Sequence, residues 1–283
     1  MSCTREIGPN LRVCLETDNP PFSSKSDPHR GLDYEIAELV AVALKRPLEI
    51  HWYSASMEEE FPLPLQINAL LSDGQCHLVG GYPLTQDGLG DPSTEKLRRA
   101  EPNGTPYWIR LNTLLATQPY MSLPLTLISA DRSANSTDLD LDLALEGRLA
   151  VEAQSFANAI AIAHAGPRRQ AGILALTDVD DAIFEAVEKG LAGYAFVEVH
   201  RFEIYHARHP TTPLSQSDSR HGLAINTGMA GIAPELLDEV NRAIHDLMEA
   251  GQIAKVVKAY GLSYHPPSRP AILPPITARL LAQ

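Results

Sequence analysis

The chain has 283 residues, of which 23 are Lys or Arg and 35 are Asp or Glu, so its formal net charge is −12. This acidic balance disfavours nucleic acid and anionic membrane surfaces as partners, because both need clustered lysine and arginine. The apolar fraction of 44% is that of a folded protein, and the length suits one large or two ordinary domains. No stretch approaches the ~18 apolar residues of a membrane span.

The first half of the chain alternates between strand and helix patterns. Short apolar runs predict strands at 11–16, 48–53 and 76–81. Helices are predicted between them at 31–46 and 64–72, the first with an apolar face at 3.6-residue spacing. This alternation predicts a doubly wound, mainly parallel sheet flanked by helices.

The segment 85–113 breaks this pattern. It contains three glycines, three prolines and the basic residues Lys96, Arg98 and Arg99. We therefore expect an irregular loop, and a loop of this length in a compact domain is usually functional or mobile.

A second alternating unit follows this segment. Strands are expected at 123–129, 148–152, 172–176, 194–199 and 222–226. Helices are expected at 157–165, 178–189, 202–209, 234–249 and 253–260. The polar run 131–138 predicts a solvated loop.

This order places the second unit inside the first. We expect 8–124 and 223–262 to form one lobe, 125–222 the other, and the Pro-rich 263–283 an extended C-terminal tail. The chain would cross twice between the lobes, which makes a hinge and an interlobe cleft, where ligands prefer to bind. The predicted fold class is α/β, with a mixed, mainly parallel sheet in each lobe.

Three cysteines, Cys3, Cys14 and Cys76, are too few for a disulfide scaffold. Cys14 and Cys76 fall in strands that the sheet would place side by side, so a disulfide in an oxidising compartment and two buried thiols are both open. A nucleophilic Cys14 is disfavoured, because a cysteine in an apolar strand is more often a core residue. The glycine-rich, zinc-binding and nucleophile-elbow motifs of familiar enzymes are absent from the sequence.

The order of seven motifs resembles the family 3 periplasmic solute-binding proteins, the amino-acid-type receptors of ABC importers. They are LRVC-x4-NPPFS, GLDYEIAELVAVAL, INALLSDGQCHLVGG, ATQPYMSLPLTLIS, EGRLAVEAQSFANAI, VEKGLAGYAFVEVHRF and LLDEVNRAIHDLMEAGQIAKVVKAYGL. They span roughly residues 10–262. The two cysteine positions are similar to those of the subset found beside quinoprotein alcohol dehydrogenases. The resemblance implies the two-lobed type II fold and a periplasmic location, with a signal peptide removed.

The resemblance also implies a set of ligand contacts. The family's carboxylate-binding arginine falls on Gly88, so an arginine of the 85–113 segment, such as Arg110, is its expected substitute. The family's amino-group aspartate falls on Glu198, its second-lobe threonine on Ser155, and its stacking aromatic on Asn19. The residues expected at the ligand are Asn19, Phe22, Gly81, Tyr82, Arg110, Tyr120, Gln154, Ser155, Phe156 and Glu198.

Aromatic residues offer a second set of candidates. Trp108 is expected to face the cleft, and Trp52, Tyr53 and Phe61 are the alternative for a flat pocket. Because two of the three standard amino-acid contacts are lost or altered, a small polar or aromatic molecule is expected instead of a generic α-amino acid.

The resemblance implies a monomeric, non-enzymatic receptor that closes on its ligand and delivers it to an ABC permease. Two alternatives stay open. One is a periplasmic accessory protein that binds a quinoprotein dehydrogenase or its cofactor. The other is an enzyme on the same scaffold, similar to cyclohexadienyl dehydratase, with Glu198 as an acid. We expect no metal or cofactor of the protein's own, no nucleic-acid partner and no membrane insertion.

Overall fold

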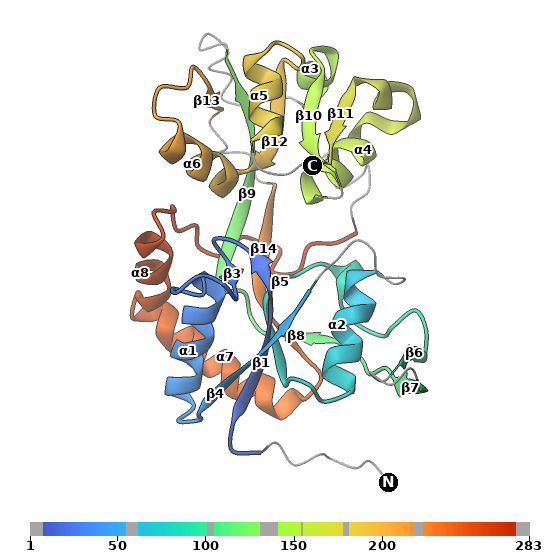
Figure 1. Ribbon diagram of the computed structural model, residues 1–283, viewed down its shortest axis with the longest axis vertical. Coiled ribbons are helices and arrows are strands. Elements are labelled where there is room, and N and C mark those ends of the chain that lie inside the picture. The colour runs from blue at the N-terminus through green and yellow to red at the C-terminus, as the bar shows by residue number, and fades with distance from the viewer. Residues whose placement is uncertain are drawn as a thin grey trace. The chain divides into compact units, whose positions relative to one another are not determined.

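The computed structural model describes residues 8–54, 62–100, 105–130, 141–153, 155–177, 181–217 and 223–275. The chain divides into two compact units, each an α/β assembly (Figure 1). Unit 1 comprises Met1–Met121 and Asn226–Tyr260, and unit 2 comprises Ser122–Ile225 and Gly261–Gln283. The chain therefore passes between the units three times, the third time where the C-terminal segment returns to unit 2.

Unit 1 is built on a sheet with the strand order β14-β5-β1-β4, and β8 lies beside β14. The strands β1, β4 and β5 run parallel, whereas β14 is antiparallel to β5. The strands are β1 (Leu11–Glu16), β4 (Leu48–Tyr53), β5 (Leu78–Pro83), β8 (Leu115–Ala116) and β14 (Ala224–Gly231). The helices are α1 (Leu32–Ala43), α2 (Leu63–Ser72), the short η1 (Gln86–Gly88), α7 (Pro234–Glu249) and α8 (Gln252–Ala259). Two small antiparallel pairs complete unit 1, β2 (Asp18–Asn19) with β3 (Ser23–Ser24) and β6 (Lys96–Ala100) with β7 (Pro106–Arg110).

Unit 2 has the strand order β11-β10-β12-β9, with β13 beside β9. Its strands are β9 (Met121–Ser129), β10 (Leu149–Glu152), β11 (Ile173–Leu176), β12 (Tyr194–Glu198) and β13 (Ser215–Gln216). Its helices are α3 (Leu141–Glu146), α4 (Phe156–Arg169), η2 (Gln170–Gly172), α5 (Ala182–Glu188) and α6 (Val199–Arg208). Neighbouring residues of β12 enter opposite cores, Phe196 the one with α4 and Val197 the one with α5, as a strand covered on both faces requires.

Several predicted elements coincide with the structure. The bounds of β1, β4 and α7 agree with the prediction, because each is a clean apolar pattern with a strong stop signal. The helix α4 contains a break at Gly166, whose φ of 58° is not helical, so its regular part ends at Ala165 as predicted. The predicted loop at 131–138 lies outside the described residues, as do the expected start of a helix at 178 and of a strand at 222.

The prediction of an irregular loop at 85–113 is wrong. After η1 the segment forms the antiparallel β6–β7 hairpin, which packs on α2 at the edge of unit 1 (Figure 1). Leu97 and Ile109 face each other across the hairpin and are buried against Ala69 of α2. The glycines and prolines that favoured a loop fall mostly outside the strands, and Pro106 sits at a strand start, where proline is tolerated.

A disulfide joins Cys14 of β1 to Cys76, with 5.6 Å between the two Cα atoms. Both residues are buried in a core cluster with Ile67, Val79 and Tyr82. Cys76 lies just before β5, which begins at Leu78 and not at Cys76 as predicted. The bridge therefore ties β1 to the segment that leads into its neighbouring strand β5.

Candidate functional site

The carboxyl ends of the parallel strands of unit 1 bring acids and tyrosines together. Glu16 ends β1, Tyr53 ends β4, and Tyr82 lies near the end of β5. Asp33 joins them from the first turn of α1, which begins in the connection after β1. In open α/β sheets, ligands bind at this edge. We call Glu16, Asp33 and the nearby Asp18 the acidic cluster.

Asp33 is held by a chain of hydrogen bonds. The backbone N–H of Gly81 donates to the hydroxyl of Tyr120 at 3.0 Å, and this hydroxyl donates to Asp33 Oδ1 at 3.0 Å. The backbone N–H of Asp33 donates to the carbonyl of Phe22 at 2.7 Å. Tyr120 is fully buried and Asp33 is 4% exposed. The fold thus fixes a carboxyl group in a site with little water.

The pKa values of Asp33 and Glu16 are both raised, mainly by burial. Burial raises the pKa of Asp33 to about 7, while the Tyr120 hydrogen bond opposes the shift and the charge of Glu16 adds to it. Burial also raises the pKa of Glu16, the charge of Asp18 adds to that shift, and the Asn19 side chain opposes it. No lysine or arginine among the described residues forms an ion pair with Glu16 or Asp33. The negative charge of this edge is therefore not neutralised within the described part of the chain.

The raised pKa of Asp33 makes stability depend on pH. Between the ordinary carboxyl pKa of 3.8 and about 7, the folded state holds a proton that the unfolded state has lost. Asp33 by itself should therefore lower the free energy of unfolding by about 2 kcal/mol between pH 5 and pH 7, while the buried His200, whose pKa burial lowers to about 3, acts in the opposite direction. Asp33→Asn should remove this fall in urea unfolding curves, whereas the exposed Glu38→Gln should leave it in place. An unchanged pH profile in Asp33→Asn would contradict this assignment.

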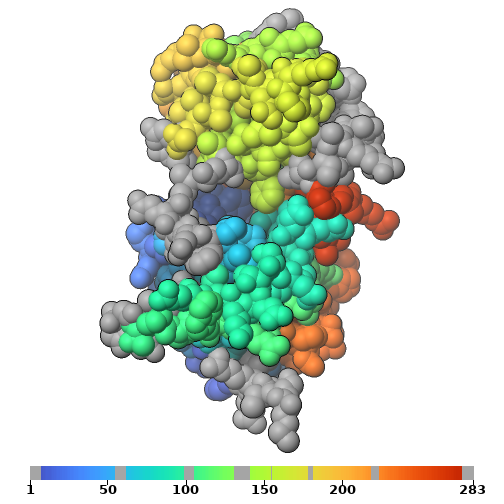
Figure 2. All heavy atoms as spheres, turned by 90° about the vertical axis from the view of Figure 1, so that its right-hand side faces the viewer, coloured from blue at the N-terminus to red at the C-terminus, as the bar shows by residue number. Residues whose placement is uncertain are grey.

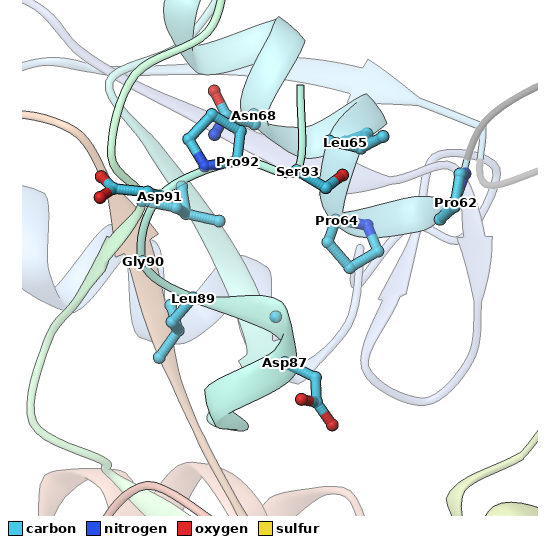
Figure 3. Close-up of a pocket in the computed structure, with 12 residues that line it drawn as sticks. Pro62, Pro64, Leu65, Asn68, Asp87, Leu89, Gly90, Asp91, Pro92 and Ser93 are labelled. Carbon is cyan, nitrogen blue, oxygen red and sulfur yellow. The ribbon is translucent and has the colours of Figure 1, made fainter. Parts of the chain in front are cut away.

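A pocket of about 340 Å³ lies in unit 1 between α2 and the segment 87–93. Figure 3 shows the first turn of α2, with Pro64 and Leu65, on one side and the segment from Leu89 to Ser93 on the other. Gly88 lines the pocket, and its carbonyl accepts a hydrogen bond from the Tyr82 hydroxyl at 2.5 Å. The pocket wall is thus anchored to a tyrosine that follows Gly81 in β5.

Two polar side chains that line this pocket form hydrogen bonds within the protein. The amide of Asn68 donates to the carbonyl of Asn112 at 2.6 Å, and a carboxylate oxygen of Asp91 accepts from Thr113 at 2.5 Å. Most of the remaining lining side chains are apolar, which suits the body of a small molecule.

Unit 2 has a corresponding edge at the carboxyl ends of β10 and β12. Ser155 caps α4, because its hydroxyl accepts from the backbone N–H of Asn158 at 3.0 Å. Glu198 ends β12 and is partly buried, and burial raises its pKa. Close to it, Arg201 pairs with Glu152 at 3.3 Å. This edge carries a helix N-terminus and an ion pair, in contrast to the unneutralised acids of unit 1.

The structure distributes the predicted ligand residues over both units. Asn19, Phe22, Gly81 and Tyr120 all lie at the acidic cluster, through the contacts given above. Tyr82 is buried beneath the pocket wall. In unit 2, Ser155, Phe156 and Glu198 lie at the edge just described.

Of the remaining candidates, only Tyr53 is placed at the acidic cluster. Arg110 is exposed on the β6–β7 hairpin, and Trp108 beside it is 65% exposed. Tyr53 borders the acidic cluster, while Trp52 is partly buried in β4. Gln154 and Phe61 lie outside the described residues.

The sequence reasoning missed Glu16 and Asp33 as site residues. The available signal was positional, because Glu16 is the last residue of a predicted strand and Asp33 stands in the first turn of a predicted helix. Within the described ranges, no group of three or more His, Cys, Asp or Glu side chains is arranged to hold a metal ion. No helix in these ranges is both long and apolar enough to cross a membrane.

Neither a protein-family model nor a curated protein sequence matches the chain. Solved structures do match its fold. The YckB protein of Bacillus subtilis superposes with a TM-score of 0.64 and 14% identity over 89% of this chain and 90% of that one. The GluR0 ligand-binding core in complex with L-glutamate gives 0.61 and 16% over 89% and 97%. An ancestral arginine-binding protein bound to arginine gives 0.56 and 18% over 89% and 98%. The chain therefore has the two-lobed α/β fold of the type II periplasmic binding proteins.

Proposed function

We propose that this protein is an extracytoplasmic solute-binding protein whose ligand carries a cationic group held at the acidic cluster. The observation that carries the proposal is the pair Glu16 and Asp33, two carboxyls at the ligand-binding edge of a sheet that form no ion pair with any of the described residues. The sequence led us to expect a small polar or aromatic ligand, and the proposal adds that this ligand carries a positive charge.

A bound cation would relieve the electrostatic cost of this edge. Two acids close together in a poorly hydrated site raise each other's pKa, and a positive charge nearby has the opposite effect. Glu16 is partly exposed, so it is the carboxyl assigned to direct contact with the ligand. Asp33 is buried and contributes through its charge.

The fold by itself does not decide the ligand. Among proteins of similar structure, one is bound to arginine and another to L-glutamate. The local charge is what favours a cation here. Lobe closure, delivery to an ABC permease, a periplasmic location and the absence of catalysis belong to this proposal and rest on the resemblance of sequence and fold.

A thermal-shift panel tests the proposal. The cationic probes are L-arginine, L-lysine, putrescine and choline, and the comparison solutes are L-glutamate, citrate and glucose. At 100 times its Kd, a ligand should stabilise the protein by about 2.7 kcal/mol. At least one cationic probe should do so and should be recovered unchanged by mass spectrometry.

Variants assign the effect to the site. Glu16→Gln should weaken binding of that probe at least tenfold, whereas the matched Glu38→Gln on the exposed face of α1 should not. Stabilisation by the anionic solutes alone, or full binding by Glu16→Gln, would refute the assignment. Turnover of a probe would favour an enzyme on this scaffold instead.

A further inference from the structure

The β6–β7 hairpin presents a basic and aromatic face to solvent. Its residues alternate between two faces, with Leu97 and Ile109 buried against α2 on one of them. The other face carries Lys96, Arg98, Trp108 and Arg110, all of them exposed. The hairpin lies at the surface of unit 1 (Figure 2). We call these four residues the basic face.

The cross-strand pairing of the basic face does not serve the stability of the hairpin. Lys96 lies directly opposite Arg110, and like charges at opposite positions destabilise a strand pair. Arg98 lies opposite Trp108, whose side chain is 65% exposed. No ion pair within the described residues involves any of the three cations of this face. A partner outside this fold would satisfy all four side chains.

We propose that the basic face docks an acidic segment of another protein, with Trp108 as the apolar anchor at its centre. Trp and Arg are the residues that most often dominate the energy of protein interfaces. Three cations on four neighbouring positions complement carboxylates that flank an apolar side chain of the partner. This proposal is independent of the ligand assigned to the acidic cluster.

An anionic membrane is the weaker partner for this face. Each basic residue near such a membrane contributes about 1 kcal/mol, and the attraction fades within a Debye length of about 8 Å. Three cations would have to overcome the repulsion of a chain with a net charge of −12. A protein segment contacts only the local face and avoids most of that repulsion.

Trp108 fluorescence provides a direct test. The other tryptophan is removed by Trp52→Phe, so emission reports on Trp108 alone. The probes are a nine-residue peptide of alternating glutamate and leucine, the same peptide with glutamine in place of glutamate, and vesicles containing 30% phosphatidylserine. We expect the glutamate peptide alone to shift the emission to shorter wavelength, with an apparent Kd that rises several-fold between 50 and 300 mM salt.

A charge-matched control separates the basic face from net charge. The triple variant Lys96→Glu, Arg98→Glu, Arg110→Glu should raise the apparent Kd for the glutamate peptide at least tenfold. The triple variant Arg242→Glu, Lys255→Glu, Lys258→Glu changes net charge equally, at exposed positions of α7 and α8, and should leave it within twofold. Circular dichroism melting curves check that both variants fold.

Several results would overturn the proposal. They are absence of binding by the glutamate peptide, equal binding by the glutamine peptide, equal loss in the two triple variants, or an emission shift only with vesicles. The last result would assign the basic face to a membrane surface. None of these results bears on the solute panel, so the two proposals fail separately.

Discussion

Gly81→Ala is expected to lower the free energy of unfolding by about 4 kcal/mol, with two physical causes. Gly81 has a φ of +64°, and an L-residue in this conformation costs about 1–2 kcal/mol. A Cβ at this position would also collide with Oδ2 of Asp33, which the Tyr120 hydrogen bond holds in place. Overpacking of this kind typically adds about 1–3 kcal/mol. Urea unfolding monitored by circular dichroism measures the sum.

Gly190→Ala is the matched control. Gly190 has a similar φ of +70°, but an added Cβ there would meet no atom within 4 Å. This variant should therefore show only the backbone cost, about 1 kcal/mol. Equal losses in the two variants would mean that Asp33 does not occupy the space next to Gly81.

Loss of the Cys14–Cys76 disulfide is expected to cost about 4 kcal/mol. The bridge closes a loop with a sequence separation of 62 residues and restricts the unfolded chain over that length. The double variant Cys14→Ala, Cys76→Ala should lower the denaturation midpoint to the value of the reduced wild-type protein.

Cys3→Ala provides the control for the disulfide experiment, because it removes the remaining cysteine. Without reductant, this variant should have the same denaturation midpoint as the oxidised wild-type protein. With reductant, its midpoint should fall as that of the wild type does. A midpoint of the wild-type protein that does not respond to reductant would show that the bridge contributes nothing to stability.

The sequence predicted the regular parts of the fold because their signals are local. In β1, LRVCLE is a buried run that ends before two prolines, and α7 repeats apolar residues at helical spacing. The β6–β7 hairpin was not predicted because the run of alternating apolar and polar residues is short in each of its two strands. Its burial depends on Ala69 and Leu65 of α2, which are distant in sequence.

The candidate site was predicted only in part, for a related reason. Asn19, Gly81 and Tyr120 were named from a resemblance, and in the structure they surround the two acids that were missed. Glu16 and Asp33 matter because they are buried and because they act on each other although they are 17 residues apart in the sequence. A carboxyl in the first turn of a helix is ordinary, since acids are favourable near a helix N-terminus, and a single acid at a strand end carries no signal of its own. Only the tertiary fold makes them a cluster.

Calorimetric titration measures directly whether the acidic cluster binds a cation. The cationic probe with the largest thermal shift is titrated at pH 7 in phosphate and in Tris, two buffers with different ionisation enthalpies. Because a bound cation lowers the pKa of Asp33 from about 7, binding should release protons, and Glu16→Gln should weaken it at least tenfold. Binding without proton release that survives Glu16→Gln would place the ligand elsewhere and contradict the account.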